Sequence, residues 1–253
     1  MTRTVAEWWR PAGRRMSSVV ACAMLLCAVG AACESADDAA LPVAPGTQPV
    51  NPIDVAPSSH GGLRILYLGD SITRGSGASS YADSYRERIT ATAKQAYPVT
   101  EQVVAQGGAR LAEVAAVAAP VAAADIVVIQ LGTNDLLAPP TPTDLFSRQY
   151  RDLMISVRQV NPTSAVICAG LWRPSSKARH YDRVIQDECS ASRSRFVPLS
   201  DLFDNPELRG PVGREALGID GHGDSFHPNN RGHSEIAKRL TGTIRLERAE
   251  ASP

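Results

Sequence analysis

The chain of 253 residues has little of what marks several large classes of protein. It shows no internal repeat, no C-x-x-C pair and no Cys/His cluster with zinc spacing, so neither a repeat architecture nor a metal site is expected. Lysine plus arginine equal aspartate plus glutamate at 26 each, which leaves no basic excess for phosphate contacts and predicts no nucleic-acid partner. Aromatic residues make up only 5% of the chain, too few to line a long apolar groove.

Residues 1–33 are typical of an export signal. Arginines end at Arg15, and residues 19–32 (VVACAMLLCAVGAA) are then uncharged and apolar. This run is shorter than the roughly 20 residues that a membrane-spanning helix needs, and small residues precede Cys33, as signal peptidases require. We therefore expect an exported protein. After residue 32 there remain 22 basic and 25 acidic residues, a net charge of about −3 by side-chain counting.

The end of this signal leaves two alternatives open. The sequence GAAC resembles a bacterial lipobox, in which the cysteine is lipidated and becomes the mature N-terminus. Cys33 would then anchor the protein to the outer face of the cell membrane. Gly30, however, stands where that motif usually has an aliphatic residue. Ordinary cleavage after Ala32 and free secretion is the alternative.

A single folded domain is predicted for residues 61–248, with a short tail at 249–253. Residues 34–60 contain five prolines and almost no large apolar residues, so they are expected to form a disordered tether. The whole chain is 43% hydrophobic and 21% charged. This composition gives the remaining length a full core without metal or disulfide support.

Within the domain, short apolar runs alternate with amphipathic stretches. This alternation predicts crossover connections and a parallel sheet covered on both faces, that is, a three-layer α/β/α sandwich. In such a sheet, ligands bind at the carboxyl ends of the strands. Strands are expected at 63–68, 100–105, 126–131, 165–169 and 195–199, and helices at 81–95, 111–124, 143–161, 178–190 and 230–247.

Four polar blocks lie where functional residues are expected. GDSITRGSG begins at Gly69 after the first strand, QGGA at Gln106 after the second, GTND at Gly132 after the third, and DSFHPN at Asp224 before the last helix. Each block alone is typical of a turn or a helix cap. Together, in order and at one end of one sheet, they indicate a catalytic site.

The residue types in these blocks suit ester cleavage, which needs a nucleophile, a base, a group that orients the base, and donors for the oxyanion. Ser71 is the candidate nucleophile and His227 the candidate base. Asp224, three residues earlier, can accept a hydrogen bond from the other ring nitrogen of His227. The candidate oxyanion donors are the backbone amides of Ser71 and Gly108 and the side-chain amide of Asn134. A glycine at 108 lets the backbone approach a substrate closely.

The blocks resemble those of the SGNH hydrolases, also called GDSL esterases and lipases. Ser71, Gly108, Asn134 and His227 match the residues that name the family, and Asp224 matches its acidic partner of the histidine; Gly107 is the alternative to Gly108. The resemblance implies the SGNH hydrolase fold with a flavodoxin-like sheet. It also implies an acyl-ester hydrolase with no metal or organic cofactor.

Other residues in and near the blocks have structural interpretations. Asp70 and Asp135 are read as loop and helix caps, and the loop around His222 as support for the Asp224 turn rather than a metal cluster. Trp172 suits either the pocket or the core. The stretch 173–187 is rich in both charge signs and is read as a solvated face.

Two cysteines, Cys168 and Cys189, remain in the body of the domain. In an oxidising exterior they form a plausible disulfide, with free buried thiols as the alternative.

We predict an exported serine esterase that hydrolyses short-chain acyl esters of a small molecule or a saccharide through a Ser-His-Asp triad and an acyl-enzyme. The alternatives are acyl transfer to a saccharide, a lipase or lysophospholipase, and a catalytically inactive cell-surface binding module. The sequence leaves the oligomeric state open.

Overall fold

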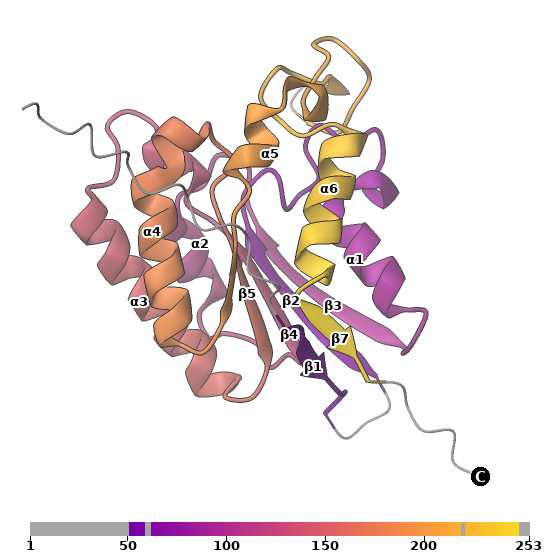
Figure 1. Cartoon of the computed structure of the whole chain (residues 1–253), viewed down its shortest axis with the longest axis vertical. Coiled ribbons are helices and arrows are strands. Elements are labelled where there is room, and N and C mark those ends of the chain that lie inside the picture. Colours follow the sequence, from indigo (N-terminus) through magenta and orange to yellow (C-terminus); the bar gives the residue numbers. More distant parts are fainter. Residues whose placement is uncertain (1–50, 59–61, 219–220, 248–253) are drawn as a thin grey trace, which may run out of the picture. The chain divides into compact units, whose positions relative to one another are not determined.

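The computed structural model describes residues 51–58, 62–218 and 221–247 (Figure 1). Its centre is a parallel sheet of five strands in the order β3-β2-β4-β5-β6. Counted along the chain within this sheet, the order is 2-1-3-4-5, which is the flavodoxin-like arrangement. The predicted fold is thereby confirmed. The strands are β2 (Leu63–Gly69), β3 (Val99–Ala105), β4 (Ile126–Gln130), β5 (Ala165–Ala169) and β6 (Arg195–Val197).

Helices cover both faces of the sheet, as Figure 1 shows. One apolar cluster joins one face of the sheet to α1 (Tyr85–Ala93), α5 (Ser200–Asp204) and α6 (Asn230–Thr241). A second cluster joins the other face to α2 (Leu111–Ala118), α3 (Thr143–Val160) and α4 (Ser175–Ala191). Because both faces are covered, the central strands IVVIQ and AVICA are buried at every position. The edge strand β3, by contrast, has no fully buried position and carries polar residues.

Local features of the sequence shorten two of the predicted helices. The expected helix 81–95 is divided: a 3-10 turn η1 (Tyr81–Asp83) comes first, and α1 starts after Ser84, whose hydroxyl accepts from the amide of Glu87. The expected helix 111–124 ends at Ala118, because Pro120 has no amide to donate and disfavours helical backbone before it.

The domain also begins earlier than predicted. Within the expected tether, β1 (Ile53–Val55) pairs in parallel with β7 (Ile244–Leu246), so the last expected helix ends at Thr241 and a strand follows it. Val55 is buried against the core, and the amide of Ser58 donates to Asp125 at 3.1 Å. Residues 51–58 therefore belong to the folded domain, and the tether prediction is wrong for them.

Some predictions fall on residues outside the described ranges: the export signal, Cys33, and residues 34–50 of the tether. In the described part of the chain, no helix is long and apolar enough to cross a membrane. Cys168 on β5 and Cys189 on α4 are joined in a disulfide, with their Cα atoms 6.3 Å apart. Two further 3-10 turns are η2 (Thr133–Leu136) and η3 (Pro206–Leu208).

Candidate active site

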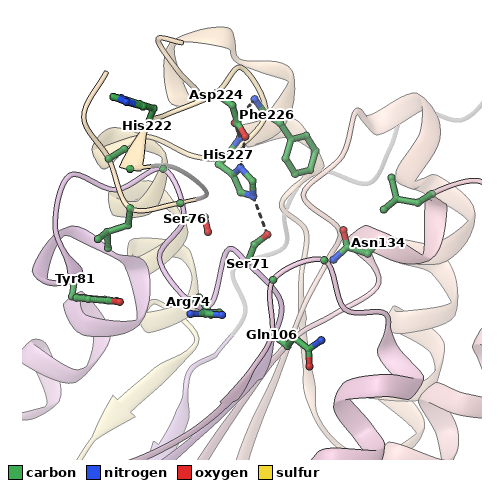
Figure 2. Close-up of a pocket in the computed structure, with 18 of the residues that line it drawn as sticks. Ser71, Arg74, Ser76, Tyr81, Gln106, Asn134, His222, Asp224, Phe226 and His227 are labelled. Carbon is green, nitrogen blue, oxygen red and sulfur yellow. Dashed lines mark hydrogen bonds and ion pairs between the residues drawn. The ribbon is translucent and has the colours of Figure 1, made fainter. Parts of the chain in front are cut away.

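A cleft of about 950 Å³ lies at the carboxyl ends of the strands (Figure 2). Its walls come from the segments that follow β2, β3, β4 and β5 and from the loop before α6. The four polar blocks of the sequence therefore meet in one place, as the parallel topology requires. We call residues 70–77, after β2, the nucleophile loop, and residues 224–228, before α6, the histidine turn.

Ser71, His227 and Asp224 form a continuous hydrogen-bonded chain in this cleft (Figure 2). The Oγ atom of Ser71 lies 2.9 Å from Nε2 of His227, and Nδ1 of His227 lies 2.7 Å from Oδ2 of Asp224. The two segments that meet here are 156 positions apart in the sequence. The structure thus brings the three predicted triad residues together.

The charge of Asp224 assigns the direction of these hydrogen bonds. Burial raises the pKa of this carboxyl, but hydrogen bonds from the backbone and ring of His227 and from the backbone of Phe226 outweigh it and hold the pKa below its usual value. An ionised carboxylate only accepts, so Nδ1 carries the proton and Nε2 is left to accept from the hydroxyl of Ser71. This is the tautomer that a general base needs.

The histidine turn is shaped by its own carboxylate and by one buried indole. Oδ1 of Asp224 accepts from the amides of Phe226 and His227 at 2.8 and 2.7 Å, which closes the turn. Nε1 of Trp172 donates to the carbonyl of Phe226 at 2.7 Å, and the Trp172 side chain is fully buried. Of the two interpretations left open for Trp172, the structure selects the core.

The nucleophile loop approaches the histidine turn without a side chain between them. Gly77 has a φ of +89°, and a Cβ atom there would lie 2.3 Å from the carbonyl oxygen of Pro228 and 2.9 Å from Cβ of His227. Only glycine permits this contact. Its role in the GDSITRGSG block is therefore to let Ser71 and His227 come within hydrogen-bond distance.

The candidate oxyanion donors line the same cleft. Gly108 has a φ of +76° in a turn closed by the amide of Ala109 and the carbonyl of Gln106 at 3.2 Å. One amide hydrogen of Asn134 donates to the carbonyl of Ala109 at 2.9 Å, which leaves the other to donate elsewhere. Gly107 and Gly108 both line the cleft, with Ser71 and Asn134.

The nucleophile loop rests on a buried polar network. Asp70, fully buried, accepts from the amide of Ile72 at 2.9 Å and from Nε2 of Gln130 at 3.4 Å. Thr73 donates to Oε1 of Gln130 and bonds the hydroxyl of Tyr85 at 2.7 Å. Burial raises the pKa of Asp70 to about 7, against the effect of these hydrogen bonds.

Asp135 also has the capping position proposed for it. Its Oδ2 accepts from the amide of Leu111 at 3.0 Å, at the start of α2, and its Oδ1 accepts from the hydroxyl of Thr141 at 2.8 Å. The carboxylate thereby ties η2, which carries Asn134, to the neighbouring helix.

His233 is a supporting residue that the sequence analysis did not single out. It is fully buried on α6, accepts from the amide of Tyr85 at its Nδ1 and donates from Nε2 to the carbonyl of Ser76 at 3.1 Å. Burial lowers the pKa of His233 to about 4, so the ring stays neutral and holds the end of the nucleophile loop. Its partners lie about 150 positions away, and no local pattern reveals them.

The cleft also contains side chains given other roles above. Arg173 was placed on a solvated face, but it lines the cleft, and its Nε donates to the carbonyl of Thr133 at 2.9 Å. His222 lines the cleft as well. Within the described residues, no group of three or more His, Cys, Asp or Glu side chains is placed to hold a metal ion.

Comparison with known proteins identifies a family profile that matches this region. The profile is that of the GDSL-like Lipase/Acylhydrolase family, and it matches residues 67–234. A curated relative, the cellulase/esterase CelE of Acetivibrio thermocellus, is 27% identical over 124 residues. The match covers 47% of this chain but only 14% of that much longer protein.

Solved structures share the fold at low sequence identity. A family two carbohydrate esterase from Clostridium thermocellum in complex with cellohexaose aligns with a TM-score of 0.54 at 19% identity, over 74% of this chain and 65% of that one. A catalytic mutant of an acetylxylan esterase from Geobacillus stearothermophilus aligns with a TM-score of 0.56 at 17% identity, over 76% and 98% of the two chains. At such identities the likeness establishes the architecture.

Proposed function

Because the chain belongs to the GDSL-like Lipase/Acylhydrolase family, we propose that it is a serine esterase that hydrolyses short-chain acyl esters, with acetylated saccharides as the substrate class. The observation that carries the proposal is the hydrogen-bonded chain from Ser71 through His227 to Asp224. The related proteins are a cellulase/esterase, a carbohydrate esterase bound to cellohexaose and an acetylxylan esterase, which supports a saccharide ester as substrate.

In the proposed mechanism, the hydroxyl of Ser71 attacks the ester carbonyl while Nε2 of His227 takes its proton. Asp224 stabilises the imidazolium that forms. The oxyanion is held by the amides of Ser71 and Gly108 and by the free amide hydrogen of Asn134. His227 then protonates the departing alcohol, which leaves an acyl-enzyme.

Water enters in the second half of the reaction. His227 takes a proton from it as its oxygen attacks the acyl carbonyl, and the carboxylic acid is released when the proton returns to Ser71. A sugar hydroxyl in the place of water would give acyl transfer with the same three residues. The difference between the two reactions thus lies in what reaches the acyl-enzyme.

The cleft lining supports a short acyl group. Most of its residues are glycine or carry polar side chains, and its large apolar side chains are few: Tyr81, Leu137, Leu217 and Phe226. A long acyl chain needs an extended apolar groove to leave water. An acetyl or butyryl group needs only a small apolar contact.

A chain-length series tests the proposal. We expect kcat/KM to be highest for nitrophenyl acetate or butyrate and to fall for laurate and palmitate. A maximum at laurate or longer would favour a lipase or lysophospholipase. Product analysis in water and with added sugar acceptors separates hydrolysis from acyl transfer, and absence of turnover on every ester would favour a binding module.

We also propose that the protein is exported by its first 33 residues. The Cys168–Cys189 disulfide supports this, because such bonds persist in oxidising compartments. The mass of the mature N-terminus, measured on protein from the producing cell, tests it. An N-terminus that still carries residues 1–32 would contradict export.

Detergent partitioning of the wild type and of C33S separates lipidation from free secretion. If Cys33 is lipidated, the wild type enters the detergent phase and C33S the aqueous phase. If the protein is freely secreted, both the wild type and C33S stay in the aqueous phase.

A further inference from the structure

Two arginine side chains line the cleft that holds the catalytic serine and histidine. Arg74 lies in the nucleophile loop, three residues after Ser71, and Arg173 lies in the segment after β5. In the view of Figure 2, Arg74 lies on the side of Ser71 away from Asn134, between Tyr81 and Gln106. The charges therefore enter the cleft from two different strand ends.

The charge of Arg74 has no partner among the residues that the structure describes. Its side chain is exposed, lines the cleft, and takes part in none of the ion pairs or side-chain hydrogen bonds of those residues. Most other arginines near this end of the domain are engaged; Arg110, for example, donates to the carbonyls of Leu137 and Pro139. Arg74 is thus available to a ligand.

Arg173 is fixed in place but not neutralised within the cleft. Its Nε donates to the carbonyl of Thr133, and its guanidinium lies 4.6 Å from the centre of the Phe226 ring. Among the hydrogen bonds of the described residues, its two terminal nitrogens are unused. A guanidinium held in this way loses little further freedom when it binds an anion.

Among the described residues, the cleft lining carries fewer carboxylates than these two positive charges. Asp224 is the lining acid among the described residues, and it already accepts from the His227 ring and from two backbone amides. Asp70 acts electrostatically on Arg173, but it is fully buried and does not line the cleft. Among the described lining residues the two arginines thus outnumber the single carboxylate, and a cleft focuses the positive field that results.

We propose that the substrate is an acylated acidic saccharide, whose carboxylate is bound by Arg74 while its ester lies at Ser71 and Arg173 adds to the positive field of the cleft. This inference rests on the proposed esterase function and names its substrate class. A guanidinium fork matches the two oxygens of a uronic acid carboxylate. Tyr81, which is 59% exposed at the same wall, offers a ring face to a neighbouring sugar unit.

The test compares two substrates that differ only in the carboxylate: the monoacetyl esters of a methyl glucuronoside and of the matching methyl glucoside. We expect kcat/KM to be about five- to tenfold higher for the acidic ester at low salt, and the preference to shrink as sodium chloride is added. R74Q should reduce the ratio of acidic to neutral kcat/KM several-fold, and R74K, which keeps the charge, should retain most of it.

R179Q is the matched control, because Arg179 is exposed on α4 and outside the cleft lining, and the change removes the same charge. Its ratio should equal that of the wild type. A wild-type ratio of one, or an equal fall of the ratio in R74Q and R179Q, overturns the inference while leaving the esterase function intact. If neither these sugars nor any nitrophenyl ester is hydrolysed, the proposed function itself fails.

Discussion

The nucleophile loop and the histidine turn meet at one hydrogen bond but are held in opposite ways. In the loop, Asp70 is fully buried and lies in a network with Gln130 and Thr73. In the turn, the side chain of Asp224 is 52% exposed and that of His227 is 21% exposed. The loop is therefore positioned by interior contacts that also belong to the fold, whereas the turn is positioned mainly by the hydrogen bonds of one carboxylate.

This difference separates reactivity from stability. A change at Asp224 should alter the orientation of His227 and leave the core untouched. A change at Asp70 should alter the free energy of unfolding, because it disturbs the hydrogen bonds between a buried polar group and its partners.

The largest effect is expected where the two regions meet. S71A should lower kcat by about 10⁴- to 10⁶-fold, since the nucleophile is lost while the fold is kept. Ester turnover measures the loss, and urea unfolding should give a midpoint close to that of the wild type. Full activity in this variant would contradict the interpretation of the protein as a serine hydrolase.

The second prediction concerns the histidine turn. D224N should lower kcat by about 10³- to 10⁴-fold, because a neutral amide neither stabilises the imidazolium nor enforces the Nδ1–H tautomer. The free energy of unfolding should change little, since the side chain is half exposed. A large loss of stability with normal kcat would reverse the comparison between the two regions.

The third prediction concerns pH and the nucleophile loop. The pKa of Asp70 is raised from 3.8 to about 7, so the folded state holds its proton where the unfolded state has lost it. The contribution of Asp70 to the free energy of unfolding therefore falls as pH rises from about 4 to 7, by up to about 4 kcal/mol. D70N lacks this titration, so its free energy of unfolding should rise relative to that of the wild type over that pH range.

Urea unfolding of both proteins at pH 4 to 8 gives the difference in stability. His233, whose pKa is lowered to about 4, stabilises the folded state increasingly as pH rises from 4 to 6.5. That opposite contribution is present in both proteins and cancels in the difference. A difference that stays constant from pH 4 to 8 would contradict the prediction.

Fourth, N134A should lower kcat by roughly 10²- to 10³-fold with little change in KM, the usual cost of losing one oxyanion donor. Asn134 stands on η2 and lines the same cleft, and it should matter only when charge develops on the substrate. Steady-state kinetics on nitrophenyl acetate give both constants. A change confined to KM would assign Asn134 to substrate binding.

The smallest effect is expected away from both regions. Cys168 and Cys189 are 21 positions apart, so their bond should stabilise the fold by about 3 kcal/mol in the chain-entropy model. Urea unfolding with and without reductant measures this, and kcat under native conditions should not change. Two alkylatable thiols in the mature protein without reductant would show that the bond is absent.

Much of the fold was predictable from the sequence, because buried parallel strands give continuous apolar runs such as IVVIQ and AVICA. The hydrogen-bonded chain of Ser71, His227 and Asp224 was predictable because the strand-end blocks carry these residue types in order. Strand β1 was missed because three residues are too short for a periodic pattern and their partner is β7, at the other end of the domain.

The long-range contacts that support the site were not predicted, for a related reason. Trp172 contacts Phe226 across 54 positions, and His233 contacts Tyr85 across 148. Such contacts arise only once the chain is folded, so local propensity does not reveal them. Arg173 was placed on a solvated face because the charged run after it resembles one, although the turn after β5 directs this first residue into the cleft.

The central claim is that Ser71 is a nucleophile activated by His227. Labelling with a fluorophosphonate followed by peptide mapping tests it most directly, because the reagent bonds to activated serines. We predict one phosphonylated residue, Ser71, formed in step with the loss of ester turnover. Loss of turnover with the label on a different residue, or no label on an enzyme that hydrolyses esters, would contradict the account.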